Sequence, residues 1–222
     1  MNNTTPQKKA GMVHQIWWLA IAAAAAGLWV GSQIFSPKTV PVPDDIRATL
    51  LPGPRDLPAF ELVNHKGESF TPDDLIGHWN FLFFGYTHCP DVCPTTLSVL
   101  NSVATRLESN PESSLDARFL FVSVDPERDT PERLAQFVPY YNKEFSGLTG
   151  PPEAIEGLTR FLGIMHMRVN EGNGVGYLVD HTASVLLVDP QGRFSGLFSP
   201  PLSASQIEAD FIKIARYYEE TQ

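Results

Sequence analysis

Cysteine is scarce in this chain, since Cys89 and Cys93 are the only two among 222 residues. Iron–sulfur clusters normally need four cysteine ligands, so a cluster held by this chain alone is excluded. No cysteine lies near the N-terminal apolar run, which excludes a lipid-anchored cysteine there. A disulfide between positions 89 and 93 would close a very small loop and would constrain the unfolded chain little. The pair therefore indicates a function rather than a structural staple.

Charged residues are missing from residues 10–37, which contain no Asp, Glu, Lys or Arg. Within this window residues 16–35 form an almost unbroken apolar run, and about 20 such residues suffice to cross a bilayer as a helix. Apolar residues continue beyond the alanines at 22–26, which a short signal-peptide core would not need. We therefore expect an uncleaved transmembrane anchor over residues 16–35.

The charges on either side of the run predict its orientation. Lys8 and Lys9 precede it and Asp44 and Asp45 follow it, so the positive-inside rule places residues 1–15 in the cytoplasm as a short tail. The rest of the chain is then expected outside the cytoplasm. A mitochondrial protein would usually carry a longer transit peptide. We expect a bacterial inner-membrane protein that crosses the membrane once, with its C-terminal domain in the periplasm.

Acidic residues are absent from the first 40 positions, whereas three of the 16 basic residues lie there. All 25 acidic residues therefore fall beyond the anchor, and a surface with this excess of negative charge repels nucleic acid. Residues 36–54 are rich in proline without an apolar period, which predicts a linker. Residues 55–222 are sufficient for one domain with its own core.

The apolar and turn patterns of this domain predict an α/β fold. Strands are expected over residues 59–63, 69–71, 80–86, 118–124, 184–188 and 194–198, and helices over 94–108, 131–141, 152–162 and 205–220. This order predicts a mixed central sheet flanked by helices, in which the two internal strands are parallel neighbours. A cysteine at a strand-to-helix junction of such a sheet is a thioredoxin-like arrangement.

The turn that carries the two cysteines lies at this junction. Pro94 resists an interior helical position, so we expect the helix to begin there, with Cys93 beside the positive end of its dipole and favoured as a thiolate. Soft thiolates bind Cu(I), zinc or iron–sulfur clusters. Structural zinc needs four ligands, whereas two cysteines and one imidazole suffice for copper. By itself the pair is compatible with a zinc site, a redox dithiol or a copper site.

Four of the six histidines are poor candidates for a third ligand. His14 lies before the apolar run, on the opposite side of the expected membrane. His65 and His78 lie in polar turns, where a histidine is most simply solvated. His88 adjoins Cys89 and points elsewhere if the strand geometry continues, which favours a supporting role over direct ligation.

The remaining two histidines lie further along the chain. His166 stands between Met165 and Met167, and two methionines on a strand more often pack in a core than bind copper. His181 precedes a strongly apolar strand. A thioredoxin-like fold brings the loop before its terminal hairpin close to the active-site turn, which makes His181 the strongest candidate.

Three motifs in order resemble the Sco/SenC family. They are Phe84-Gly85-Tyr86-Thr87-His88-Cys89-Pro90-Asp91-Val92-Cys93-Pro94, Val124-Asp125-Pro126-Glu127-Arg128-Asp129-Thr130 and Val179-Asp180-His181-Thr182. The family comprises membrane-anchored, thioredoxin-like copper proteins that take part in assembling the binuclear copper centre of cytochrome c oxidase. The resemblance spans about residues 55–220. It implies a loop over residues 125–129 near the site, and copper ligands at Cys89, Cys93 and His181.

The resemblance implies a copper metallochaperone that binds Cu(I) or Cu(II), with cytochrome c oxidase subunit II as a partner and other copper chaperones as further ones. An enzymatic alternative is a thiol–disulfide oxidoreductase that reduces the cysteines of the oxidase, with Cys89 and Cys93 as its redox pair. The three residues between the cysteines, and the lack of proline between positions 175 and 188, disfavour a general oxidoreductase. A thiol peroxidase is disfavoured because nothing nearby resembles its activating arginine. The first two functions are compatible, because copper binds the reduced dithiol.

Overall fold

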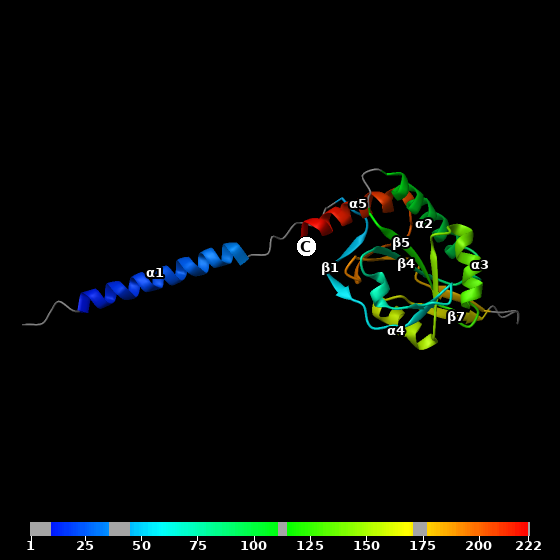
Figure 1. Ribbon diagram of the computed structural model, residues 1–222, viewed down its shortest axis with the longest axis horizontal. Coiled ribbons are helices and arrows are strands. Elements are labelled where there is room, and N and C mark those ends of the chain that lie inside the picture. The colour runs from blue at the N-terminus through cyan, green and yellow to red at the C-terminus, as the bar shows by residue number, and fades with distance from the viewer. Residues whose placement is uncertain (1–9, 36–44, 111–114, 171–176, 222) are drawn as a thin grey trace, which may run out of the picture. The chain divides into compact units, whose positions relative to one another are not determined.

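The computed structural model describes residues 10–35, 45–110, 115–170 and 177–221 (Figure 1). It divides into two compact units, one formed by residues 1–41 with 220–222 and the other by residues 42–219. Residues 1–9 of the expected tail and residues 36–44 of the expected linker lie outside the described residues.

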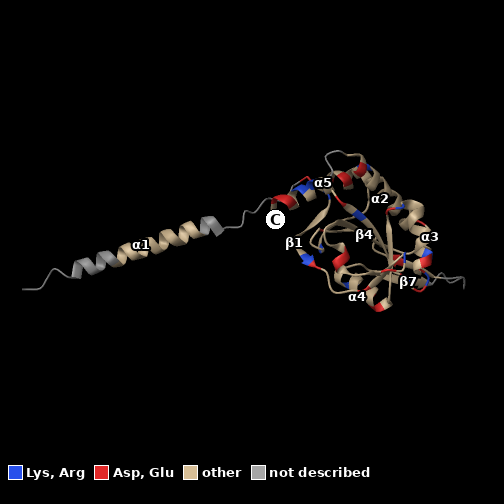
Figure 2. Ribbon diagram, in the orientation of Figure 1, with Lys and Arg blue, Asp and Glu red and all other residues tan. Residues whose placement is uncertain are grey.

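Helix α1 (Ala10–Phe35) coincides with the expected anchor, and Figure 2 shows no charged residue in its described part. The structure describes the side chains of this helix over residues 17–31. Among them, Trp17, Trp18 and Trp29 are exposed. Within the part of the chain that the structure describes, no helix is long and apolar enough to cross a membrane. The helix is thus present, and the transmembrane span over residues 16–35 is not confirmed.

The second unit is built on a mixed sheet with the strand order β1-β10-β9-β4-β5-β6-β2-β3. Its strands are β1 (Thr49–Asp56), β2 (Leu62–Asn64), β3 (Ser69–Phe70), β4 (Trp79–Gly85), β5 (Ala117–Ser123), β6 (Ser146–Thr149), β9 (Val185–Val188) and β10 (Arg193–Phe198). The pairs β4–β5 and β5–β6 are parallel, whereas β9 joins β4 in the antiparallel sense. A separate antiparallel hairpin consists of β7 (His166–Asn170) and β8 (Tyr177–His181).

Helices flank this sheet, as expected (Figure 1). They are α2 (Val92–Ser109), α3 (Pro131–Tyr141), α4 (Pro152–Leu162) and α5 (Ala204–Thr221), with a short 3₁₀ helix η1 at Pro72–Leu75. Strand β4 is buried along its whole length, which explains its continuous apolar sequence. Phe81 of β4 stacks on Phe119 of β5 with 4.9 Å between ring centroids, and Phe211 of α5 meets Phe81 edge-on at the same distance.

The expected strands and helices are confirmed within a few residues, and the parallel pairing of the two internal strands is also confirmed. Two of the differences in boundary have a clear physical reason. Strand β1 occupies part of the stretch predicted as linker, because it is an edge strand whose register shifts between Leu50 and Arg55, and edges and bulges tolerate proline. Helix α2 begins at Val92, two residues before Pro94, which is tolerated because the first turn needs no N–H from it.

Candidate metal centre

Both cysteines belong to one turn between β4 and α2. The turn closes where the Cys89 backbone N–H donates to the carbonyl of Tyr86 at 3.2 Å. Because α2 begins at Val92, Cys93 lies in its first turn and donates its backbone N–H to the Cys89 sulfur at 3.4 Å. The two thiols are free and adjacent, and no disulfide joins them.

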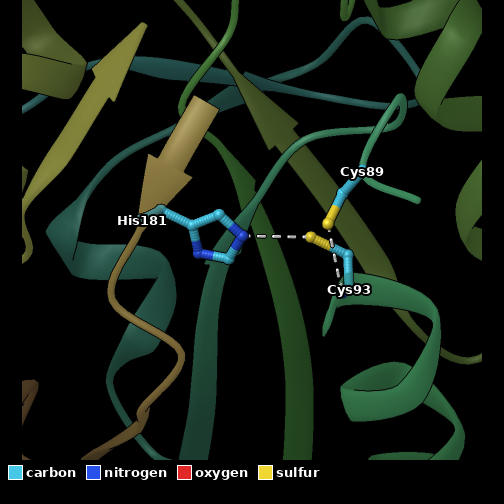
Figure 3. A group of neighbouring side chains, drawn as sticks. All are labelled: Cys89, Cys93 and His181. Atoms are coloured by element: carbon cyan, nitrogen blue, oxygen red, sulfur yellow. Dashed lines mark hydrogen bonds between the residues drawn. The ribbon is translucent and has the colours of Figure 1, made fainter. Parts of the chain in front are cut away.

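His181 reaches the cysteines from the end of β8. Its Nε2 lies 3.3 Å from the Cys93 sulfur, and its Nδ1 lies 3.1 Å from the carbonyl oxygen of Thr182. A carbonyl can only accept, so Nδ1–H donates to Thr182, and Nε2 is the ring nitrogen that lies toward the sulfurs. The ligand atoms of Cys89, Cys93 and His181 all lie within 4.8 Å of one another (Figure 3). Among the described residues this is the group of three or more Cys, His, Asp and Glu that converges closely enough to hold a metal ion.

A glycine at the end of β4 makes room for the Cys93 sulfur. A Cβ atom added at Gly85 would lie 2.7 Å from that sulfur and 2.9 Å from the ring of Phe121. Contacts of this length are shorter than van der Waals contact, so any larger residue displaces one of these groups. Cys93 is fully buried and Cys89 is partly exposed, so solvent reaches the centre on the side of Cys89.

The two thiols have opposite pKa shifts. The pKa of Cys89 falls to about 4, mainly because the Cys93 thiol donates its proton to the Cys89 sulfur, and also because backbone N–H groups at Asp91 and Cys93 point at it. The pKa of Cys93 rises because its proton is held by Cys89 and because the side chain is buried. The prediction of a thiolate at Cys93 is therefore wrong. The N–H groups of the helix start point at Cys89, outside the helix, rather than at Cys93 within it.

The buried carboxylate of Asp129 anchors the cysteine turn through hydrogen bonds. It is fully buried and accepts hydrogen bonds from the Thr87 backbone N–H at 2.9 Å, the Thr87 hydroxyl at 2.6 Å and the Ser123 hydroxyl at 2.7 Å. These bonds fix the chain between β4 and Cys89 against the end of β5. The loop over residues 125–129 thus lies next to the site, as the family resemblance implies.

The same loop fixes the hairpin that carries His181. Tyr177, the first residue of β8, donates its hydroxyl to the buried carboxylate of Asp125 at 2.7 Å. Arg128 donates to the Tyr177 carbonyl at 3.1 Å, stands over the Tyr177 ring at 3.8 Å and forms an ion pair with Asp125. These contacts bring His181 to the cysteines, although it lies 88 positions after Cys93 in the sequence. Sequence reasoning did not find Tyr177, which lies two residues before the third motif and is not part of it.

The other histidines make separate contacts. His65 is not simply solvated, since its Nδ1 accepts the backbone N–H of Gly147 at 3.1 Å, and His78 pairs with Asp116 at 2.6 Å. His88 lies 3.1 Å from the Thr87 hydroxyl, which agrees with a supporting role.

His166 lies 3.3 Å from the hydroxyl of Thr159 on α4. The neighbouring Met165 and Met167 are exposed, so the prediction that they pack in a core is wrong. The side chain of His14 lies outside the described residues.

Together, the mixed sheet, the cysteine turn at a strand-to-helix junction and the histidine from a later hairpin define a thioredoxin-like domain with a candidate site for a soft metal ion. Residues 52–216 match the SCO1/SenC family model, which is well over half of the chain. The chain belongs to the SCO1/SenC family.

Individual relatives agree with this assignment. The chain is 36% identical over 149 residues to an SCO2-like protein of Rickettsia prowazekii, covering 67% of this chain and 71% of the relative. The crystal structure of Arabidopsis thaliana ScoI with copper bound superimposes with a TM-score of 0.69 at 33% identity, covering 72% of this chain and 98% of that one. The structure of Bradyrhizobium japonicum ScoI with copper bound gives a TM-score of 0.63 at 33% identity, covering 73% and 99%.

Proposed function

We propose that the protein is a copper metallochaperone whose cargo is held by Cys89, Cys93 and His181. The observation that carries this proposal is the convergence of two sulfur atoms and one imidazole nitrogen within 4.8 Å of one another. Thiolate and imidazole are ligands that Cu(I) accepts, whereas carboxylate and carbonyl oxygens suit harder ions. Structural zinc would need a fourth ligand, and the described residues contribute three to this group. The two solved relatives with copper bound support the same metal.

The site is also suited to releasing its cargo. Three protein ligands leave a coordination position open, and the partly exposed Cys89 lies where an incoming ligand can approach. An acceptor thiol can then bind the ion before the bond to Cys89 breaks. We propose cytochrome c oxidase subunit II as this acceptor and other copper chaperones as donors, as the resemblance to assembly factors of the oxidase copper centre implies.

We further propose that the domain acts in the periplasm, attached to a bacterial inner membrane by the N-terminal helix. The support is the run without charged residues over 10–37, with lysines before it and aspartates after it. A fusion of alkaline phosphatase to the C-terminus tests this, because that enzyme is active only outside the cytoplasm. Inactive fusion protein that is stably produced would refute it.

Thiol–disulfide exchange is a second candidate function, which the low pKa of Cys89 favours. The Cys89 thiolate would attack an acceptor disulfide and form a mixed disulfide, and the other acceptor sulfur would leave as a thiolate. Cys93 would then lose its proton and attack Cys89, which leaves a disulfide in this protein and a dithiol in the acceptor. This step delivers two electrons and no metal.

One experiment separates the two functions. The reduced full chain, with and without one equivalent of Cu(I), is mixed anaerobically with the copper-binding domain of subunit II in either its dithiol or its disulfide form. The chaperone proposal predicts that copper moves to the dithiol acceptor. Retention of copper by this protein in a large excess of dithiol acceptor would refute it. Reduction of the disulfide form by the copper-free chain would establish the second function.

A further inference from the structure

Two methionines beside the candidate centre are exposed to solvent. Met165 has 80% of its surface accessible and Met167 has 64%. The chain contains four methionines, and the other two, Met1 and Met12, lie in the N-terminal segment. Large apolar side chains that are gathered on a surface commonly mark a site of interaction, and core packing no longer accounts for this pair.

The pairing of β7 with β8 places the two methionines next to His181. His166 pairs with His181, and Met167 pairs with Asp180. Met165 continues the same register, because its carbonyl accepts the backbone N–H of Thr182 at 2.9 Å. Cross-strand partners share a face of the hairpin, so Met165 and Met167 lie together on the outer face, and His181 extends from the inner face toward Cys93.

The spacing of the two methionines allows both sulfurs to bind one ion. Residues two apart on a strand have Cα atoms about 6–7 Å apart, and their side chains point to the same side. The unbranched methionine side chain has several rotatable bonds, so two thioethers can converge across this distance. A shallow hollow of about 950 Å³ is lined by both methionines and also by Asp180 and His181. It therefore connects the outer face to the residue that completes the cysteine centre.

We propose that Met165 and Met167 form a low-affinity Cu(I) site that passes the ion to the centre formed by Cys89, Cys93 and His181. This proposal rests on the proposed function. Thioether sulfur is soft and uncharged and has no titratable proton. It therefore selects Cu(I) and binds it without competition from protons. Copper remains Cu(I) throughout the transfer. Its bonds to the two thioethers break as bonds to His181 Nε2 and the two cysteine sulfurs form, and the proton of Cys93 passes to solvent.

The first test uses the full chain with Cys89→Ser, Cys93→Ser and His181→Ala, which removes the stronger site. Labelling the methionine methyl groups with ¹³C gives four signals, and anaerobic Cu(I) is the titrant. The signals of Met165 and Met167 are expected to shift together along one binding curve that fits one ion per chain, while the other two stay unchanged. Four signals that shift in parallel, or no shift at all, would overturn the proposal. This variant reports on the methionines even if the natural chain binds no copper at the cysteines, so the two failures are distinguishable.

The second test measures how fast the natural centre is loaded. The full chain with Met165→Leu and Met167→Leu keeps similar apolar side chains but lacks both thioethers, and Met12→Leu is the matched control. Mixing each reduced protein with Cu(I) held by a chelator gives the rate of loading and the final affinity. We expect several-fold slower loading of the double variant, with the affinity of the centre unchanged and the control equal to the natural chain. Equal loading rates for all three proteins would refute a role in transfer.

Discussion

Asp129→Ala tests whether the buried carboxylate under the cysteine turn positions the metal ligands. This substitution leaves the Thr87 N–H, the Thr87 hydroxyl and the Ser123 hydroxyl without their common acceptor. The hydroxyls can turn to other acceptors, whereas the backbone N–H cannot. One orphaned buried donor costs about 1–3 kcal/mol, and each lost hydrogen bond to a charged group about 1.5–3 kcal/mol. Relief of the buried charge offsets part of this, so we expect the free energy of unfolding to fall by about 3–5 kcal/mol.

The same substitution is expected to weaken copper binding by about 10–100-fold, the usual effect of removing a group that orients metal ligands. Denaturation of the reduced, metal-free chain followed by circular dichroism measures the first effect. Competition with a Cu(I) chelator measures the second. If Asp129→Ala fails to fold, Asp129→Asn retains one acceptor for the Thr87 N–H and is expected to show a smaller loss of both quantities.

Asp189 provides the matched control because it is also fully buried but lies at the turn between β9 and β10. Its carboxylate accepts from the backbone N–H groups of Gln191 and Arg193 and pairs with the Arg193 side chain at 2.7 Å. Asp189→Ala should therefore destabilise the fold without weakening copper binding. Equal losses of copper affinity in the two variants, or an unchanged affinity in Asp129→Ala, would refute a positioning role for Asp129.

Three further predictions concern the same site. Gly85→Ala places a Cβ atom 2.7 Å from the Cys93 sulfur, so Cu(I) affinity measured by chelator competition should fall, and an unchanged affinity would contradict the close packing. The pKa of Cys89 near 4 means that its thiolate is lost only as the pH falls through that value, so iodoacetamide should modify the reduced chain almost as fast at about pH 6 as at about pH 8. An alkylation rate that keeps rising toward pH 9 would contradict this. Tyr177→Phe removes a donor to a buried carboxylate and should cost about 1–3 kcal/mol of unfolding free energy, whereas Tyr140→Phe, at an exposed position, should cost nothing measurable.

Local pattern was sufficient to predict the elements that carry the cysteines. The unbroken apolar run of β4 and the prolines near the starts of α2 and α3 each indicate one type of structure, so the strand-to-helix junction followed from the sequence. Strand β1 was not predictable, because its prolines resemble those of a linker and its pairing with β10 joins segments more than 130 residues apart.

The chemistry of the site was less accessible than its residues. Cys89, Cys93 and His181 could be selected from the sequence, and the structure brings them together. Which thiol ionises depends on the direction of one S–H bond and on which sulfur the helix N–H groups face, and neither is encoded in spacing. Likewise, Met165 and Met167 alternate as core residues of a strand would, and only the position of their hairpin outside the main sheet shows that they face solvent.

The central claim is that two thiolates and one imidazole hold Cu(I). The most direct measurement is the Cu(I) affinity of the reduced full chain and of its Cys89→Ser, Cys93→Ser and His181→Ala variants, with X-ray absorption spectra of each loaded protein. We predict one ion per natural chain, a spectrum of two sulfur ligands and one nitrogen ligand, and a large loss of affinity in all three variants. A His181→Ala variant that retains the natural affinity and an unchanged spectrum would contradict the three-ligand site.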